Sequence, residues 1–262
     1  MPKPPFVELS DGSTLVRLPI LYEDRSLLAV DKPAGWMLIP FSWQKTPWNL
    51  QAALTSSIAS GAFWARARGI RFLRAIHRLD AETTGILLCG KSPGSVESYS
   101  ELFESRRIEK IYLAVVEGVP KPREWVVRDP IGPVPGQPGR MRVDPRHGKP
   151  AETRFRLLQA SGGRALIEAR PVTGRTHQIR VHLARAGLPI AGDAVYGRSG
   201  KPGSSANYPM ALRAVAVRFR DPFTRQPIRI EAPSDEFLRA WGWIRETAVG
   251  DRRDSRDGAV GR

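Results

Sequence analysis

A carboxylate with neighbours suited to chemistry lies at Asp80, in the segment HRLDAETTG (residues 77–85) directly before an apolar run. A polar loop that precedes a buried strand presents its side chains from a rigid scaffold. Asp80 could therefore act as a nucleophile, a general base or a metal ligand. A lone aspartate in a turn more often accepts hydrogen bonds from nearby backbone N–H groups, so this segment alone decides no function.

Cationic and polar residues gather in a second segment, TGRTHQIRVH (residues 173–182), at a predicted helix start. The N-terminus of a helix attracts anions. His177 and His182 are five residues apart and do not share a helix face, unlike the two histidines of an HExxH zinc motif. We therefore expect no metal site here, and both histidines could be ordinary hydrogen-bonded residues.

A third segment, Lys110-Ile111-Tyr112, opens a predicted strand. Most strand tyrosines pack against their neighbours, so Tyr112 by itself is weak ground for assigning a function. Taken singly, none of the three segments identifies an activity.

The hydrophobic pattern predicts the elements that must position these segments. Short apolar runs predict strands over residues 26–30, 85–89, 111–117, 154–158 and 165–169, and a further pair within 212–231. Helical spacing predicts helices over 47–60, behind Ser92-Pro93, and from about Thr176 to a stop at Gly187. This mixture lacks a regular β-α-β alternation and indicates an α+β fold with a mainly antiparallel, mixed sheet and flanking helices and loops.

The ends of the chain differ in composition from its middle. We predict an N-terminal arm with little structure of its own over residues 1–19, because its prolines keep it extended. One folded domain is expected over 20–248, with a surface excursion in the Pro-, Gly- and Arg-rich residues 129–150. The polar residues 249–262 are predicted to be a disordered tail.

Charge and cysteine content narrow the class of protein. The balance of 41 Lys and Arg against 26 Asp and Glu leaves a net charge of +15, which suits a phosphate-rich partner but does not separate RNA from DNA or acidic lipid. Cys89 is the single cysteine, so an intrachain disulfide and a CxxC zinc site are excluded, and its apolar surroundings predict burial. The sequence shows no signal core and no run of ~20 apolar residues, which predicts a cytoplasmic protein without a membrane segment.

Taken together, the segments resemble the RluA-type pseudouridine synthase family. The family's catalytic motif, written HRLDxxTSG, matches residues 77–85, and four further matches follow the family's order between residues 27 and 232. These matches are Asp31 to Gly35 (DKPAG), Lys110 with Tyr112, Ala114 and Gly118, Gly174 to Arg180 (GRTHQIR), and Gly192 to Gly197 (GDAVYG). Several multi-residue matches in order are more specific than any one of them.

The resemblance implies the pseudouridine synthase fold and the corresponding RNA-modifying activity. Such an enzyme breaks the N1–C1′ bond of a uridine and rejoins the base through C5. Asp80 would be the catalytic carboxylate, kept ionised by Arg180 in a site that excludes water. Tyr112 would lie against the extruded uracil and handle a proton. The reaction needs no redox step and no net hydrolysis, so we expect no cofactor and no metal.

Further residues would contact the substrate, an expected rRNA or tRNA stem-loop, and we expect a monomer without a required protein partner. The target base must leave its stack, and the resemblance suggests that Arg78 fills the gap. Ile179 would supply an apolar wall, unless it is ordinary helix core. The other predicted substrate-binding residues are His77, Arg175 and Gln178. The residues predicted to hold the RNA backbone are Lys45, Arg66, Arg68, Arg71, Arg74, Arg106, Arg107 and Lys110.

Two positions depart from the family pattern. Thr84 replaces a serine and keeps a hydroxyl, whereas Arg213 stands in place of a histidine and is expected to affect RNA contacts or packing. Two other functions stay open at this point. One is a non-catalytic RNA-binding module of the same fold, and the other is a glycosidase-type hydrolase that pairs Asp80 with Glu82.

Overall fold

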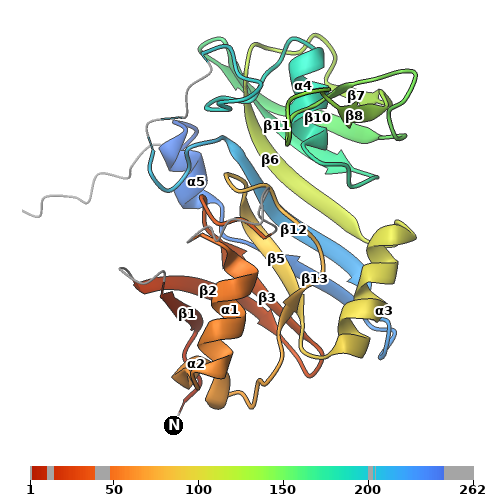
Figure 1. The fold of residues 1–262 in the computed structure, drawn as a ribbon. Helices are drawn as coiled ribbons and strands as arrows, with labels where there is room; N and C mark the ends of the chain where they lie inside the picture. Colours follow the sequence, from red (N-terminus) through yellow and green to blue (C-terminus); the bar gives the residue numbers. More distant parts are fainter. Residues whose placement is uncertain (1, 11–14, 39–47, 200–202, 204, 245–262) are drawn as a thin grey trace, which may run out of the picture.

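A single large sheet organises the protein. The computed structural model describes residues 2–10, 15–38, 48–199, 203 and 205–244. Within these ranges the chain forms an 11-stranded sheet of order β1-β2-β3-β5-β12-β6-β11-β10-β7, with β13 beside β12 and β4 beside β5, and a separate pair of β8 and β9 (Figure 1). The strands are β1 (Phe6–Ser10), β2 (Leu15–Glu23), β3 (Leu27–Lys32), β4 (Arg74–Ala75), β5 (Thr84–Gly90), β6 (Glu109–Glu117), β7 (Glu124–Val127), β8 (Ile131–Pro133), β9 (Met141–Val143), β10 (Thr153–Ser161), β11 (Arg164–Pro171), β12 (Leu212–Arg220) and β13 (Pro227–Glu231).

The pairing of these strands is antiparallel throughout the described sheet, except where β12 runs parallel to β5. This confirms the predicted α+β fold with a mainly antiparallel, mixed sheet. The helices are α1 (Leu50–Ala59), α2 (Phe63–Arg66), α3 (Pro93–Glu104), α4 (Gln178–Arg185) and α5 (Asp235–Ala240). Helices α1 and α2 pack beside β1, α3 beside β5, and α4 beside β10 and β11 (Figure 1).

Local sequence signals explain where two of the helices begin. In α3 the Ser92 hydroxyl accepts a hydrogen bond from the Ser95 N–H, the Ser95 hydroxyl accepts one from the Ser92 N–H, and Pro93 occupies the first turn, as its sequence predicts. In α1 the Asn49 side chain caps the N–H of Ala52. The predicted helix over 47–60 therefore begins at Leu50, directly after its cap.

The first residues form a hairpin, so the prediction of an arm with little structure over 1–19 is wrong. Strands β1 and β2 pair from Phe6–Pro19 to Ser10–Leu15. Val7, Leu9 and Leu18 are fully buried or nearly so and join the apolar cluster under α1 and α2. Alternating apolar residues thus outweigh the prolines that precede them, because burial of one strand face stabilises an extended segment. The predicted tail over 249–262 lies outside the described residues.

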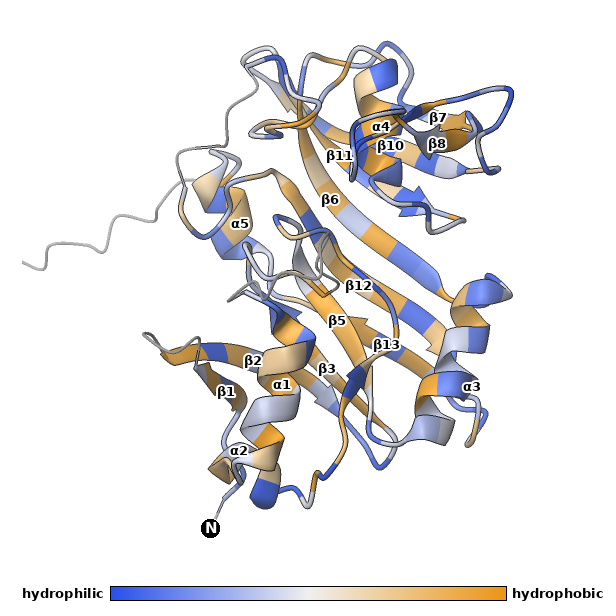
Figure 2. Ribbon diagram, in the orientation of Figure 1, coloured by the Kyte–Doolittle hydropathy of each residue, from blue (hydrophilic) through white to orange (hydrophobic). Residues whose placement is uncertain are grey.

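Burial follows the sequence pattern in the centre of the sheet. All seven residues of β5 are buried, including Cys89 as predicted, and Figure 2 shows this strand as predominantly apolar. The excursion over 129–150 contains the β8–β9 pair, and Ile131 there packs against Val181 of α4. No helix among the described residues is long and apolar enough to cross a membrane.

The parallel contact between β5 and β12 requires a glycine. Gly85 has φ +105°, and a Cβ at this position would lie 2.1 Å from the carbonyl oxygen of Ala214. Because L side chains rarely adopt such a φ and the obstacle is backbone, only a hydrogen side chain fits here. This contact fixes the strand that directly follows the segment around Asp80.

Replacing Gly85 with alanine should lower the free energy of unfolding by about 3 kcal/mol or more, because the methyl group meets backbone in a conformation that alanine disfavours. Urea unfolding followed by circular dichroism measures this loss. Gly94→Ala, in the first turn of α3 with open space around the glycine, is the matched control and should be neutral or slightly stabilising. Equal losses in both variants would contradict the close-approach argument.

Candidate active site

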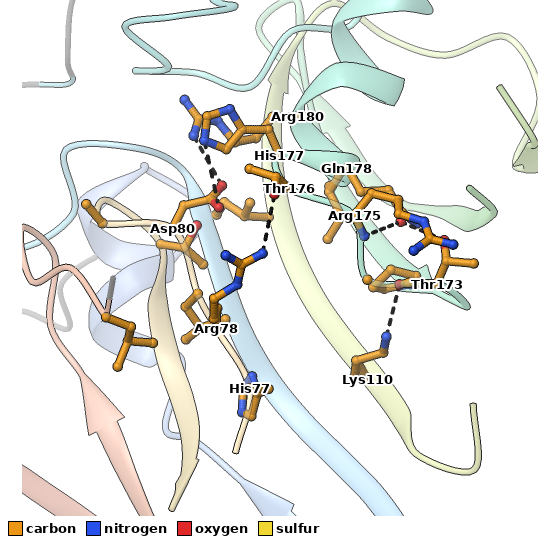
Figure 3. A pocket seen from close by; sticks show the side chains of 18 of the residues that line it. His77, Arg78, Asp80, Lys110, Thr173, Arg175, Thr176, His177, Gln178 and Arg180 are labelled. Atoms are coloured by element: carbon orange, nitrogen blue, oxygen red, sulfur yellow. Dashed lines mark hydrogen bonds and ion pairs between the residues drawn. The ribbon is translucent and has the colours of Figure 1, made fainter. Parts of the chain in front are cut away.

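A cavity of about 1090 Å³ is lined by residues of the three segments 77–85, 110–112 and 173–182. It is lined by residues 76–83 before β5, by the start of β6, and by residues 171–180, which lead into α4. Figure 3 shows Asp80 and Arg180 reaching toward each other from these separate parts of the chain. The cavity therefore brings together residues that are 100 positions apart in sequence.

Arg180 lies between two carboxylates. Its Nη1 donates to Asp80 Oδ2 at 3.1 Å, while Nε and Nη2 donate to the two oxygens of Asp193 at 2.7 and 2.8 Å. The Arg180 side chain is 3% exposed and that of Asp80 21% exposed. The predicted pairing of Asp80 with Arg180 is thus present, at the wall of a cavity and not in bulk solvent.

The charges of this triad are held by more than the ion pairs. Burial opposes the charge on Arg180, but its hydrogen bonds and attraction to Asp193 and Asp80 outweigh burial and raise the pKa of Arg180. Burial also opposes the charge on Asp193, yet Arg180 and the N–H groups of Val195 and Tyr196 lower its pKa. Asp193 therefore stays ionised and fixes the plane of the Arg180 guanidinium.

His177 also lies beside Asp80, within the segment whose cationic and polar residues were expected to attract anions. Its Nε2 lies 3.9 Å from Asp80 Oδ1, and its Nδ1 lies 2.9 Å from the Tyr196 hydroxyl. That hydroxyl oxygen also accepts from the Met141 N–H. Burial lowers the pKa of His177, which favours the neutral ring beside Asp80.

The backbone of His177 is strained at this point. Its φ is +55° directly before the first residue of α4, in the left-handed region that non-glycine residues seldom occupy. The guanidinium of Arg180 lies over the Tyr196 ring at 5.1 Å from its centroid. The same Tyr196 ring meets the His177 ring edge-on and its hydroxyl lies 2.9 Å from His177 Nδ1, so Tyr196 joins the strained residue to Arg180.

Lys32 holds the loop that carries Asp80. It is fully buried, and its ammonium donates to three backbone carbonyls. The acceptors are Pro33 (3.0 Å), Ala81 (2.8 Å) and Thr83 (2.9 Å). Burial lowers the pKa of Lys32 to about 7, against the attraction of Glu82 and Asp80. Lys32 of the segment DKPAG (31–35) therefore binds the segment HRLDAETTG (77–85) through the backbone oxygens of Ala81 and Thr83.

Four of the other predicted site residues line the cavity: Arg78, Arg175, Tyr112 and Ile179. Arg78 is exposed and its Nη2 lies 3.4 Å from the Thr176 hydroxyl across the cavity (Figure 3). Arg175 donates from Nε to the carbonyl of Pro150. Tyr112 and Ile179 line the cavity and also belong to or pack against the apolar core that contains Leu183 of α4. Ile179 is therefore helix core, and its predicted wall for the uracil stays a prediction.

His77 and Gln178 line the cavity but are engaged within the protein. His77 Nε2 accepts from the Leu88 N–H at 3.1 Å, its ring stacks on Phe103, and burial lowers its pKa to about 4. The Gln178 amide uses both of its ends. Its oxygen accepts from Thr173 and Arg175, and its nitrogen donates to Glu152 and Thr153. These contacts favour positioning roles, and their predicted substrate contacts stay predictions.

The predicted backbone-binding cations divide into distinct groups. Arg66, Arg71, Arg74, Arg106 and Arg107 are exposed, whereas Lys45 lies outside the described residues.

The prediction that Arg68 holds the RNA backbone is wrong. Its side chain is 3% exposed and donates to Glu23 and to the carbonyls of Trp64 and Pro4, so it ties α2 to the hairpin and cannot reach RNA.

Lys110 is buried, donates to the Thr173 carbonyl at 3.0 Å, and lines the cavity. Burial, with nearby Arg106, lowers the pKa of Lys110 to about 8.

Arg213, which departs from the family pattern, serves packing. Its Nη1 and Nη2 donate to the two oxygens of Asp31 at 3.0 and 2.6 Å, and it also donates to the Pro233 carbonyl. Its side chain is 3% exposed. The guanidinium therefore bridges the end of β3 to β12, and of the two expected effects, RNA contacts or packing, the structure shows packing.

Three residues of the site received no role from the sequence: Asp193, Tyr196 and Lys32. The match GDAVYG contains the first two, and the match DKPAG contains the third. Their motifs were visible, but what they contact was not. Among the described residues, no group of three or more His, Cys, Asp or Glu side chains is arranged to hold a metal ion.

Comparisons with known proteins identify the class. The model of the RNA pseudouridylate synthase family matches residues 26–185. Two solved human structures share the fold. RNA pseudouridylate synthase domain containing 1 has a TM-score of 0.64 at 27% identity, covering 82% of this chain and 83% of that one, and domain containing 4 has a TM-score of 0.68 at 24% identity, covering 84% and 90%.

Curated relatives are nearer in sequence. The chain is 36% identical over 228 residues to ribosomal large subunit pseudouridine synthase C of Escherichia coli (strain K12), covering 84% of this chain and 67% of that protein. The protein of the same name from Vibrio vulnificus is 36% identical over 223 residues, with 84% and 66% covered. The chain therefore belongs to the RNA pseudouridylate synthase family, and it is an RNA pseudouridine synthase, an isomerase.

Asp193→Asn should separate the orienting role of Asp193 from general stability. The change leaves a buried cation facing only Asp80, so the free energy of unfolding should fall by about 3 kcal/mol. The rate of pseudouridine formation, measured at a temperature where circular dichroism shows a folded protein, should fall at least about tenfold, because Arg180 loses the group that orients it.

The matched control is Asp221→Asn. Asp221 is also buried, accepts from Tyr99 and from N–H groups of its own turn, and lies outside the cavity lining. This variant should lose stability and keep the rate. If both variants lost rate only in proportion to stability, Asp193 would support the fold and nothing more.

Proposed function

We propose that this protein isomerises selected uridines of large-subunit ribosomal RNA to pseudouridine, with Asp80 as the catalytic carboxylate. The observation that carries the proposal is the contact of 3.1 Å between Asp80 and a buried Arg180, at the wall of a cavity large enough for a nucleotide. The names of the curated relatives favour ribosomal over transfer RNA.

The reaction requires a uridine outside its stack. Extrusion of a base costs a few kcal/mol, and an exposed arginine at the cavity mouth can stack on the bases that stay behind. Arg78 is suited to this role, because it is exposed and only two residues from Asp80. The extruded nucleotide would then place its ribose against the Asp80 carboxylate.

Two groups would support the carboxylate during the isomerisation. Arg180 keeps a positive charge beside Asp80 whether the cavity is open or filled, since Asp193 anchors it from behind. Burial, together with the negative charge of Asp80, raises the pKa of Tyr112, so its hydroxyl stays protonated at neutral pH. Tyr112 can therefore donate a hydrogen bond to the uracil while the N1–C1′ bond breaks and the C5–C1′ bond forms.

Asp80→Asn should abolish the activity while leaving the fold intact. Release of tritium from C5 of labelled uridine in ribosomal RNA transcripts should fall by at least about a thousandfold, because the isosteric amide lacks the charged oxygen. Glu82→Gln is the control, since only a hydrolase reading needs that carboxylate, and its rate should stay within about threefold of the parent. Free uracil among the products, or full activity of Asp80→Asn, would refute the proposal.

The substrate assignment has a separate test. Pseudouridine mapping across total RNA, in cells with the parent protein and with Asp80→Asn, should show positions in large-subunit ribosomal RNA that depend on the carboxylate. Sites confined to transfer RNA would overturn the ribosomal assignment and leave the chemistry in place.

A further inference from the structure

A second basic surface lies outside the active-site cavity. It is a groove of about 840 Å³, lined by seven arginines and Lys110 against a single carboxylate, Glu109, among the described residues. Most of these cations have no part in the chemistry argued for Asp80. Such an excess of one charge in a concave surface concentrates the opposite charge there.

The arginines form a row across the sheet. Arg229 on β13 pairs in register with Arg218 on β12, which pairs with Glu109 on β6, and Arg170 on β11 pairs with Arg154 on β10. Arg170 reaches Glu109 at 2.9 Å and closes the row. Five adjacent strands with a spacing of about 4.8 Å make this row roughly 19 Å long.

The row lies on the other side of the sheet from Tyr112. Neighbouring strand residues point to opposite faces, so Glu109 faces away from Lys110 and Tyr112. The groove nevertheless adjoins the cavity, because Arg106, Lys110 and Pro171 line both. It therefore leads from the active site round the start of β6 to the opposite face, and in Figure 1 the start of β6 lies next to α3.

Each arginine of the row has a carboxylate partner, and Arg170 also pairs with Glu168 at 2.8 Å. The positive excess of the groove therefore comes from its other lining cations, Arg106, Lys110 and Arg220. Glu109 is shared between Arg170 at 2.9 Å and Arg218 at 3.5 Å. The Nε of Arg218 is buried without a hydrogen-bond partner in the described structure. The side chains of Arg154 and Arg229 are 64% and 59% exposed despite their pairs with Glu152 and Glu231. Exposed ion pairs of this kind are weak and exchange readily for a phosphate.

We propose that this groove binds the phosphate backbone of the substrate RNA next to the extruded uridine, so that the strand wraps round the edge of the sheet. The inference rests on the proposed function, because it takes RNA as the ligand of the adjoining cavity. Guanidinium groups in a row suit successive phosphates, since each can donate two parallel hydrogen bonds. The groove would supply affinity without reading sequence.

The test uses two oligouridines, one of roughly 5 nucleotides that fills the cavity alone and one of about 30 that can also reach the groove. In the double variant Arg154→Gln/Arg229→Gln, affinity for the longer RNA should fall about tenfold at moderate salt, with the slope of log affinity against log salt smaller by about 1.4. Affinity for the shorter RNA should not change. Both residues are exposed, so the fold is not at risk.

Arg164→Gln/Arg239→Gln removes the same charge from exposed positions outside the groove and is the matched control. It should leave both affinities within about twofold. The proposal is overturned if both double variants lose equal affinity for the longer RNA, or if the first loses none. It is also overturned if Arg154→Gln/Arg229→Gln weakens binding to anionic phosphatidylserine vesicles and leaves binding to RNA unchanged. Tritium release separates the two claims, because groove-dependent binding without pseudouridine formation would refute the proposed function and retain the groove.

Discussion

A buried positive charge is the constraint on which the active site depends. An arginine taken out of water costs several kcal/mol unless its donors are matched by anions in good geometry. Arg180 meets this requirement with Asp193 on two donors and Asp80 on a third. The start of α4, the turn after residue 192 and the loop before β5 must therefore converge. Because Asp193 satisfies most of the charge, Asp80 can stay at the cavity wall and face a ligand.

The loop around Asp80 is held largely through backbone. Lys32 takes two of its carbonyls, and the parallel contact at Gly85 fixes the strand that follows. Backbone anchors leave the side chains of the loop free, which suits a loop that must present both a carboxylate and an exposed arginine. The bridge between Arg213 and Asp31 secures the same region from behind, joining β12 to β3 on either side of β5.

The sequence predicted elements best where the signal is local. The cap of α3, the apolar run of β5 and the stop of α4 at Gly187 each depend on residues within a few positions. The arm over 1–19 failed because prolines were given more weight than alternating apolar residues. Arg68 failed for another reason: a guanidinium looks the same in sequence whether it faces solvent or Glu23, and only packing against the hairpin decides.

The sequence by itself determined the family, because ordered motifs carry that information residue by residue, and the resemblance implied the pairing of Asp80 with Arg180. The order of apolar runs and helical segments predicted the mainly antiparallel α+β fold. The tertiary structure alone decided that Asp193 anchors the arginine, that Lys32 holds the loop, and that arginines of four strands line up in one groove. The physical reason is register. Strand pairing sets which distant residues share a face, and no local pattern encodes it.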